Sequence, residues 1–514
     1  MKRSTVGAIL IVLLGTFMVV VWWMLTATWK KGQVAATSDA AAVTATIRIG
    51  GDGYLGYWFI TSPEMKRLAA RRGLGVEFTN DNGAYAERLQ KFADKEYDFI
   101  VLPVNSYLEH GAKHDYPGVI VAAIAESQGA DGIVGFSDRF PSGKIQELNN
   151  ASLRVVYTPD SPSSFLLDLV ITDFDLAQLR SSNDWRVEAN GSEEVAKRAV
   201  SRSGDVFVMW EPDLSRALHE NPNLKEIWGS DKFHGYIVDV FVIHRDYVQR
   251  HAAEVTTFLE TYFTTIRNYA GKRDALLDDL VQSTGLAKQV AEPMLSKIDW
   301  YDLDENARLE FGLQTRGGLP TSEGVVNTIL ACQNVLARTG KLKGDPLHGN
   351  PYTIVNSNIV RDLKTNMPAL LGSSGSATDF APLDDAGWSR LREVGPLRVE
   401  PITFQSGVNL LDDAGKAQVD AIAALLINNY PQYRVVVGGH TGPGDAEENR
   451  KLSLERAQAV AQYLATVHGI DADRLHAEGF GSTQPPPRLP NESQRAYQYR
   501  MPRVEFVLYA GSSL

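Results

Sequence analysis

The sequence predicts an α/β protein with two lobes, followed by a smaller α/β sandwich domain at its C-terminal end. From about Thr44, short apolar strands alternate with amphipathic helices through two successive cycles, which is typical of a parallel α/β sheet. A stretch rich in Gly, Ser and Pro follows, and a third group of strands and helices begins after it. Because 514 residues exceed one ordinary hydrophobic core, more than one domain is expected.

The composition indicates a globular chain and excludes one class of partner. Hydrophobic residues make up 44% and charged residues 22%, values that a folded protein has and a disordered one lacks. The formal charge of −11, without a concentrated basic face, argues against nucleic acid. The single cysteine, Cys332, excludes an intramolecular disulfide and is expected to be a buried apolar residue.

The N-terminal segment predicts a transmembrane anchor over residues 1–31. Val6–Trp29 carries no formal charge and is long enough to span a bilayer, with tryptophans gathered near its far end. A cleaved signal peptide is the alternative, since the Ala-rich stretch at 35–42 offers small residues. The segment has no Asp, Glu or His, which separates it from ion-driven stators that need an ionisable group in the membrane.

Residues 45–365 are predicted to form the two lobes. The expected strands are Ala45–Ile49, Val76–Thr79, Tyr97–Leu102, Gly118–Ala125, Gly132–Phe136, Leu153–Tyr157, Trp185–Ala189, Asp205–Trp210 and Tyr236–His244. The expected helices run from Ser62 to about Arg72, over Ala84–Lys95, Ser163–Phe174 and Glu193–Ser201, and through most of Arg250–Gly340. The chain should cross between lobes near Gly132–Phe136 and Tyr236–His244. A ligand would then bind in the cleft between them.

Three features of this region match a known group of proteins. They are Gly53, Tyr54 and Tyr57 after the first strand, Tyr97-Asp98 before the third, and the segment Asp205–Pro212. Together with the order of elements, they resemble the substrate-binding proteins of ABC importers, especially the nitrate, taurine and aliphatic-sulfonate group. The resemblance implies the two-lobed periplasmic-binding-protein fold, a small solute in the cleft, and an ABC permease as a possible partner.

The cleft residues expected from these positions leave the charge of the ligand open. The glycine-rich turn offers backbone N–H groups, and hydroxyl and amide side chains stand at strand-to-helix junctions. Aromatic rings could form the walls of the cleft. Each polar residue could instead cap its helix. Glu211 would repel an anion or bind an amine, and these loops hold no Arg or Lys. The predicted ligand-binding residues are Gly53, Tyr54, Tyr57, Asn105, Ser161, Ser163, Ser164 and Trp210.

Residues 366–394 are predicted to be a linker and residues 395–511 the last domain. Gly, Ser and Pro punctuate the linker, so little order is expected there. The elements expected in the last domain are strands at Leu397–Phe404, Tyr433–Gly438, Leu475–Gly479 and Arg503–Tyr509, and helices at Asp412–Asn429 and from about Glu447 to His468.

The sharpest motif of the chain lies in this last domain. Gly439-His440-Thr441, Gly444, Asn449, Leu452-Ser453 and Arg456-Ala457 follow a buried strand, at a turn that offers backbone N–H groups and a helix N-terminus to an anion. They resemble the signature of OmpA-like peptidoglycan-binding domains. The resemblance implies that the domain binds the diaminopimelate of a peptidoglycan stem peptide, through the residues Thr441, Asp445, Asn449, Arg456 and Arg503.

The chain departs from this signature at the position of an aspartate. The family has an Asp directly after His-Thr, where this sequence has Gly442; Asp445 could reach the same ammonium group from a displaced position. Of the family's Asn-Arg-Arg-Val near the C-terminus, Met501-Pro502-Arg503-Val504 keeps only the second Arg. The domain assignment is therefore firmer than the binding strength that it implies.

The predicted function is a non-enzymatic, single-pass inner-membrane protein with its bulk in the periplasm. It would bind a small solute in the cleft and peptidoglycan through its last domain, in transport or envelope sensing. The alternative is a scaffold whose two-lobed domain binds an envelope protein. Neither a metal-ligand spacing nor a nucleophile motif is present in the sequence, so we expect no metal, cofactor or catalytic residue.

Overall fold

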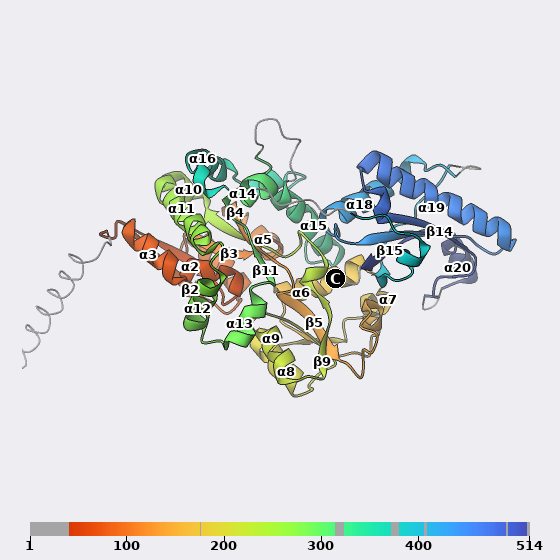
Figure 1. Ribbon diagram of the computed structural model, residues 1–514, viewed down its shortest axis with the longest axis horizontal. Coiled ribbons are helices and arrows are strands. Elements are labelled where there is room, and N and C mark those ends of the chain that lie inside the picture. The colour runs from red at the N-terminus through yellow and green to blue at the C-terminus, as the bar shows by residue number, and fades with distance from the viewer. Residues whose placement is uncertain are drawn as a thin grey trace, which may run out of the picture.

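The computed structural model describes residues 41–174, 176–313, 323–371, 380–405, 409–489 and 492–510 (Figure 1). The membrane anchor predicted over residues 1–31 lies outside these ranges. Among the residues that are described, no helix is both long and apolar enough to cross a membrane.

The first lobe is built on a six-stranded sheet with the strand order β11-β4-β10-β3-β1-β2. Strands β1, β2 and β3 run parallel, whereas β10 lies antiparallel between β3 and β4, and β11 is antiparallel to β4. The strands span Ala45–Gly51 (β1), Leu74–Asn80 (β2), Phe99–Pro103 (β3), Gly118–Ser127 (β4), Val238–His244 (β10) and Ile298–Trp300 (β11).

The second lobe is built on a five-stranded sheet with the order β7-β6-β8-β5-β9. Its parallel strands β7, β6 and β8 continue into β5 and β9, which are antiparallel. The strands span Asp131–Phe136 (β5), Val155–Tyr157 (β6), Arg186–Glu188 (β7), Val206–Trp210 (β8) and Leu224–Gly229 (β9). Strands β9 and β11 were not predicted from the sequence, because both are short and carry charged residues.

Helices cover both sheets, and one of them touches both lobes. Helix α15 packs against α5 of the first lobe and α6 of the second. The helices are α2 (Trp58–Thr61), α3 (Pro63–Arg71), α4 (Tyr85–Ala93), α5 (Val104–Gly111), α6 (Pro162–Asp173), α7 (Ala177–Ser181), α8 (Ser192–Val200), α9 (Asp213–Glu220), α10 (Arg245–Arg250), α11 (Ala252–Tyr269), α12 (Arg273–Thr284), α13 (Lys288–Met294), α14 (Leu303–Glu305), α15 (Gly324–Arg338) and α16 (Asn358–Asn366).

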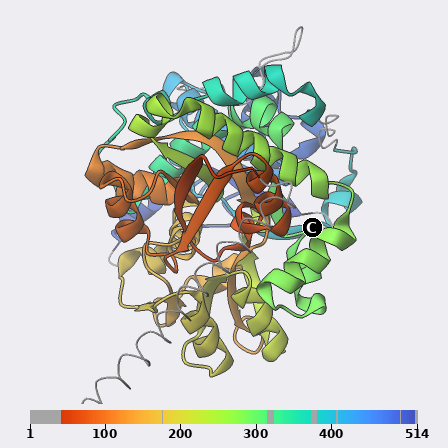
Figure 2. The ribbon, with the colours of Figure 1, turned by 90° about the vertical axis from the view of Figure 1, so that its left-hand side faces the viewer.

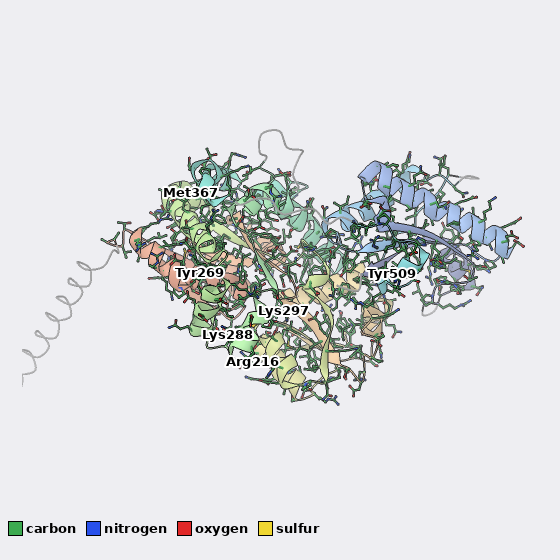
Figure 3. All side chains as sticks on the ribbon, in the orientation of Figure 1. Arg216, Tyr269, Lys288, Lys297, Met367 and Tyr509 are labelled. Carbon is green, nitrogen blue, oxygen red and sulfur yellow. The ribbon has the colours of Figure 1, made fainter. Side chains whose placement is uncertain are left out.

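The chain crosses between the two sheets twice, as the sequence predicts. It leaves β4 of the first sheet for β5 of the second, and it returns from β9 to β10. We call residues 128–130 and 230–237 the crossover segments. An ion pair also joins the lobes. Lys297, which precedes β11 and is labelled in Figure 3, lies with its Nζ 2.6 Å from Oε1 of Glu211, which follows β8.

The C-terminal part of the chain forms a third sheet with the order β12-β15-β13-β14. Its strands are β12 (Arg392–Pro396), β13 (Arg434–His440), β14 (Leu475–Gly481) and β15 (Arg503–Ala510), and its helices are α17 (Asp385–Trp388), α18 (Asp413–Asn428), α19 (Ala446–His468) and α20 (Gln494–Arg500). The first strand thus lies before the predicted position at Leu397–Phe404. It falls largely inside the stretch predicted as linker, because pairing with β15 orders residues whose own composition favours a loop.

The third sheet is docked on the second lobe rather than held apart from it (Figures 1 and 2). The buried carboxylate of Asp173, the last residue of α6, accepts hydrogen bonds from the hydroxyls of Tyr236 (3.0 Å) and Tyr430 (2.8 Å). Asn429 donates from Nδ2 to the carbonyl of His234 at 2.8 Å, and the His234 N–H donates back to the carbonyl of Asn429. One buried apolar cluster therefore runs from the first lobe into the C-terminal domain.

Candidate functional site

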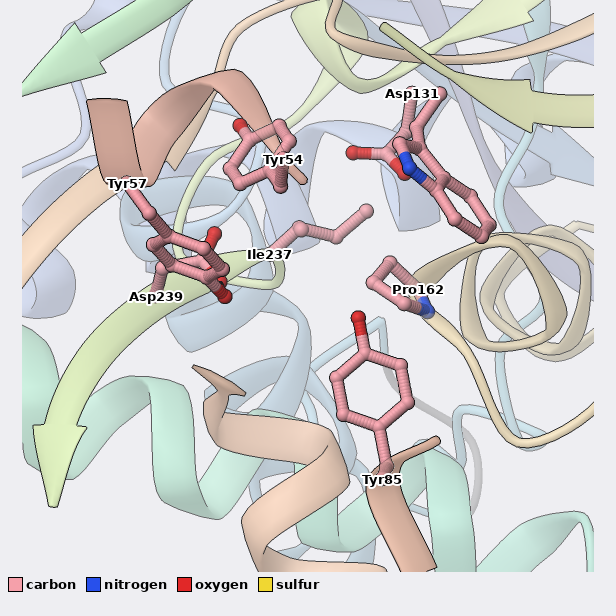
Figure 4. Close-up of a pocket in the computed structure, with 8 residues that line it drawn as sticks. Tyr54, Tyr57, Tyr85, Asp131, Pro162, Ile237 and Asp239 are labelled. Atoms are coloured by element: carbon pink, nitrogen blue, oxygen red, sulfur yellow. Dashed lines mark hydrogen bonds between the residues drawn. The ribbon is translucent and has the colours of Figure 1, made fainter. Parts of the chain in front are cut away.

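A small pocket lies between the two lobes, where residues from both sheets converge (Figure 4). Its cavity volume, counted as the space that the centre of a water molecule can occupy, is about 10 Å³. That is room for about one water. The cleft is therefore closed in this structure. The residues that line it are Tyr54, Tyr57, Tyr85, Asp131, Pro162, Trp210, Ile237 and Asp239.

The tyrosines of the first lobe come from a tight turn after β1. The turn η1 (Leu55–Tyr57) brings the rings of Tyr54 and Tyr57 together edge to face, with their centroids 5.4 Å apart. Gly56 permits this arrangement, since a Cβ atom there would lie 2.3 Å from the Tyr54 ring. The phenol of Tyr57 donates a hydrogen bond to Oδ1 of Asp239, and burial raises the pKa of both groups well above its ordinary value.

A buried arginine stands behind this wall but is fully engaged. Arg88, on α4, binds Asp81 and lies with Nη2 2.8 Å from Oδ2 of Asp52, and its Nη1 donates to the carbonyl of Val101. Its guanidinium also lies 4.6 Å from the centroid of the Tyr85 ring. Because two carboxylates share one guanidinium, the positive charge of Arg88 is fully used by its own neighbours and is not directed at the pocket.

Asp131 brings a second carboxylate from the crossover at the start of β5. Its Oδ2 accepts a hydrogen bond from the Ser127 hydroxyl at 2.7 Å, whereas Oδ1 is buried without a partner among the described residues. Burial raises the pKa of Asp131 to about 7, and the charges of Glu211 and Asp52 act in the same direction. The hydroxyl of Tyr54 is likewise buried and unpartnered. A ligand that enters the pocket can therefore bond to both atoms.

The second lobe supplies the opposite wall through the ends of β8 and α6. Trp210 closes β8 and Pro162 opens α6. Glu211, beside Trp210, does not enter the pocket: it is fully buried, accepts a hydrogen bond from the Ser215 hydroxyl and pairs with Lys297. It is a structural link between the lobes, and neither alternative considered for it from the sequence describes its position.

Three of the eight predicted ligand residues line the pocket: Tyr54, Tyr57 and Trp210. Gly53 does not. Ser161 and Ser164 form a reciprocal capping box at the start of α6, which is the structural alternative foreseen for them. Asn105 and Ser163 are also outside the lining, although Oδ1 of the first and Oγ of the second are buried without a partner. As ligand contacts, all eight stay predictions.

The sequence analysis missed Tyr85, Asp131, Pro162, Ile237 and Asp239. A usable signal was present for Asp239, which interrupts the apolar strand Val238-Asp239-Val240, whereas Asp131 stands at the start of β5, after a polar segment. A carboxylate in a buried strand is costly unless it is paired or protonated, so such a residue marks a functional position. Tyr85, at the first turn of a helix, carried no comparable signal.

A separate group of possible metal ligands lies between α5 and α6. Ligand atoms of Glu109, His110 and Asp160 all lie within 4.8 Å of one another. His110 is buried, and burial lowers its pKa to about 4, so the ring is neutral. The ammonium of Lys341 lies 3.7 Å from the Glu109 carboxylate and already supplies positive charge there. Sequence spacing missed this group because its members meet only in the fold.

The C-terminal candidate site begins where β13 meets α19. Gly439 lets the helix approach, since a Cβ atom there would lie 1.9 Å from the carbonyl of Ser453. Thr441 is buried and its Oγ1 has no partner among the described residues. Asn449 donates from Nδ2 to the carbonyl of Gly442 at 3.1 Å, and Asp445 caps α19 by accepting from the N–H groups of its first turn. Asp445 therefore has a structural role as the N-cap of α19, and its contact with peptidoglycan stays a prediction.

The two predicted arginines of this site differ in their surroundings. The Arg456 guanidinium lies 5.1 Å from the centroid of the Phe404 ring, and its Nε is buried without a described partner. Arg503 is engaged: Nε lies 2.5 Å from Oε1 of Glu505, and its other nitrogens donate to two backbone carbonyls. Glu505 also lies 3.3 Å from Nε2 of His440. Of the two, Arg456 is therefore the arginine whose guanidinium has a nitrogen without a described partner.

Comparison with known proteins identifies the C-terminal region. The OmpA family model matches residues 403–498. Probable lipoprotein YiaD of Escherichia coli is 35% identical over 85 residues, which cover 16% of this chain and 38% of that protein. Outer membrane porin F of Pseudomonas aeruginosa is 30% identical over 96 residues, covering 18% and 27%. The expected OmpA-like domain is thus confirmed, and the chain spans less than two fifths of the length of these curated relatives.

Solved structures match the two-lobed region at low identity. The nitrate-binding protein NrtA from Synechocystis PCC 6803 matches with a TM-score of 0.48 and 11% identity, over 65% of this chain and 93% of that chain. The alkanesulfonate-binding protein SsuA from Xanthomonas axonopodis pv. citri, bound to MOPS, gives a TM-score of 0.47 and 16% identity, over 62% and 100%.

Proposed function

We propose that this chain is a cell-envelope binding protein that holds a small solute between its two lobes and peptidoglycan in its C-terminal domain. The observation that supports solute binding is the closed pocket, in which Asp131 Oδ1 and the Tyr54 hydroxyl are buried without partners. Unpaired buried polar atoms are costly, so a ligand that satisfies them would stabilise the folded protein. The pocket has room for about one water in this structure, so the lobes must open wider to admit such a ligand.

The OmpA family match supports peptidoglycan attachment, and Arg456 with its unpaired Nε offers the cation for a stem-peptide carboxylate. The proposal includes the inner membrane as the site of an N-terminal anchor and the periplasm as the compartment of the rest. An ABC permease is the partner expected if the solute is transported rather than sensed.

A scaffold that binds a protein partner is the second candidate. One observation favours it, because the space in the pocket is only that of about one water, and a cleft that never opens would bind no solute. The two candidates differ in what the lobes do when small molecules are offered.

Thermal unfolding of the purified full chain in the presence of small molecules tests the solute-binding function. The panel contains inorganic anions, sulfonates, amines and amino acids, each at millimolar concentration. A compound held by the closed lobes raises the melting temperature, since it binds the folded state alone. Trp210→Ala, which removes one wall of the pocket, should abolish that rise. If no compound shifts the transition, the scaffold is the better description.

Binding to purified sacculi tests the second half of the function. The full chain should sediment with sacculi, and Arg456→Ala should remain largely in the supernatant. Arg450→Ala is the matched control, because Arg450 lies on the same helix but is exposed. Equal sedimentation of the Arg456 and Arg450 variants would remove Arg456 from the site.

A further inference from the structure

We infer that the cleft accepts a small organic cation, an ammonium group carrying apolar substituents, rather than an oxyanion. The inference rests on the proposed function, because it names the class of solute for that same pocket. It opposes the expectation that the sequence resemblance gives, which is nitrate or a sulfonate. Charge, aromatic lining and unpaired atoms each support it.

The ionisable side chains of the pocket are acidic. Asp239 of the first lobe and Asp131 at the crossover line it, and no Lys, Arg or His among the described residues does. Burial raises the pKa of both carboxyls, so each holds a proton more tightly than in water, and a cation would favour the ionised form. The nearest guanidinium, that of Arg88, is bound by Asp52 and Asp81. An oxyanion placed here would face carboxylates without a counter-charge, and burial would make that repulsion stronger than in water.

Aromatic rings supply most of the remaining wall. Tyr54, Tyr57 and Tyr85 enter from the first lobe and Trp210 from the second. In Figure 4 the hydroxyl of Tyr85 and the carboxylate of Asp131 are both directed toward the space between the lobes. Rings around a cavity attract an ammonium group through their negative faces, and they tolerate its apolar substituents. An inorganic anion gains nothing from such walls.

The unpaired oxygen of Asp131 identifies the centre of the site. Its Oδ1 has no hydrogen-bond donor among the described residues, and the side chain is 2% exposed. A carboxylate in this position is stabilised either by a proton or by a cation. The structure provides two serine hydroxyls nearby, Ser127 and Ser230, which are hydrogen-bonded to each other and leave the charge itself unbalanced. A bound ammonium group would balance it.

Calorimetric titration of the full chain at pH 8 tests the inference. The cation probes are tetramethylammonium chloride and choline chloride, and the anion probes are sodium nitrate and sodium ethanesulfonate. We expect saturable binding of at least one cation and of neither anion. Binding of an anion without a cation would overturn the inference and leave the proposed function standing. If no probe binds, the inference fails together with the evidence for a solute site.

Variants locate the bound cation. Asp131→Asn should weaken binding of the cation probe by at least tenfold, and Tyr85→Leu should weaken it by several-fold. Asp138→Asn, an exposed carboxylate just after β5, is the matched control and should bind as the unaltered chain does. The melting temperature of each variant without probe shows whether it is folded. A folded Asp131→Asn or Tyr85→Leu protein with unchanged affinity would place the cation elsewhere and overturn the inference.

The affinity should also rise with pH. A carboxyl with a pKa of about 7 is mostly protonated at pH 6 and mostly ionised at pH 8, so cation binding should strengthen by roughly tenfold over that interval. The groups that face Asp131 are Ser127, Ser230, Tyr54, Asp52, Asp239 and Glu211, of which Asp52 and Glu211 are held in ion pairs. Affinity that falls over the same interval would contradict the assignment of Asp131 as the counter-charge.

Discussion

At the scale of single residues, the polar side chains of the pocket lower the stability of the folded protein. Asp131 is buried with one oxygen unpaired, and Tyr54 beside it holds an unpaired hydroxyl. Each polar atom costs free energy in the folded state because it has left its hydration shell. Such costs are retained where a ligand removes them, which is the reason that the proposed function assigns these two residues to the solute site.

Asp131→Asn should stabilise the ligand-free protein, and more so at high pH. The folded pKa of about 7 lies above the ordinary value of 3.8, so the folded state binds the proton more tightly than the unfolded state. The stability that this proton gives is complete below pH 3.8 and is lost as the pH rises through 7. The variant avoids that loss, which amounts to about 4 kcal/mol at pH 8 and under about 2 kcal/mol at pH 5.

Urea unfolding of both proteins at the two pH values measures this difference. The Asp138→Asn protein serves as the control, because its carboxylate is exposed and should show little dependence on pH. A gain in stability that is the same at pH 5 and pH 8 would mean that Asp131 does not titrate in this range.

Gly442→Asp should be tolerated and should strengthen retention on sacculi. A Cβ atom at Gly442 meets nothing nearer than Cγ of Pro502 at 4.0 Å, so the side chain has room. Stability should change by less than about 0.5 kcal/mol. The new carboxylate would stand where the OmpA-like signature has one, and it could pair with the ammonium of the stem peptide. Sedimentation with sacculi measures retention; a folded variant that binds less would show that this loop does not contact the peptide.

At the scale of secondary structure, the junctions between strands and helices explain which site residues could be predicted from the sequence and which could not. Tyr54, Tyr57 and Trp210 were found because they follow strands, where side chains face the cleft of an α/β sheet. Ser161 occupies an equivalent position but caps α6 instead, and a sequence cannot distinguish a capping hydroxyl from a binding one. The order of elements in the two lobes was predictable, whereas β12 was missed because its pairing partner is distant in sequence.

Arg88 on α4 should be essential for the first lobe. Its side chain is fully buried between Asp52 and Asp81, so Arg88→Met leaves two carboxylates without their counter-charge. The expected loss in the free energy of unfolding is about 3–5 kcal/mol. Lys91→Met on the same helix removes only a solvent-exposed pair with Glu87 and should cost far less than the Arg88 variant. Urea denaturation at pH 7 compares them, and equal losses would show that the buried pair is not a support of the lobe.

At the scale of the whole molecule, the C-terminal domain is part of one folded body with the lobes. Asn429 and Tyr430, which follow α18, bind His234 of the return crossover and Asp173 of the second lobe, and Phe174 pairs with Leu397. The linker composition alone predicts a loosely attached domain. The docking could not be foreseen, since it depends on the Tyr430 hydroxyl meeting Asp173, an aspartate 257 residues away in the sequence.

The double variant Asn429→Ala/Tyr430→Phe should uncouple the C-terminal domain. It removes the side-chain hydrogen bonds to the His234 carbonyl and to the Asp173 carboxylate. The Asp173 carboxylate then stays buried with Tyr236 as its remaining tyrosine donor. Each lost bond costs about 1 kcal/mol, more at the charged acceptor. Calorimetry should show the domain unfolding as a separate transition below the main one. Tyr463→Phe, whose hydroxyl binds the exposed Asp420, is the control, and an unseparated transition in the double variant would disprove the role of these contacts.

The docking contact at His234 has a mechanical meaning. Residues 230–237 are the return crossover between the lobes, and the C-terminal domain holds this segment through Asn429. If that domain is fixed to the cell wall, a force on the wall acts through this contact on residues 230–237. The lobes must turn about this segment to open. Coupling between two sites is reciprocal, so a force that shifts the crossover changes the solute affinity, and a bound solute changes how much force the contact bears. The docking contact therefore ties the C-terminal domain to the segment that joins the two lobes.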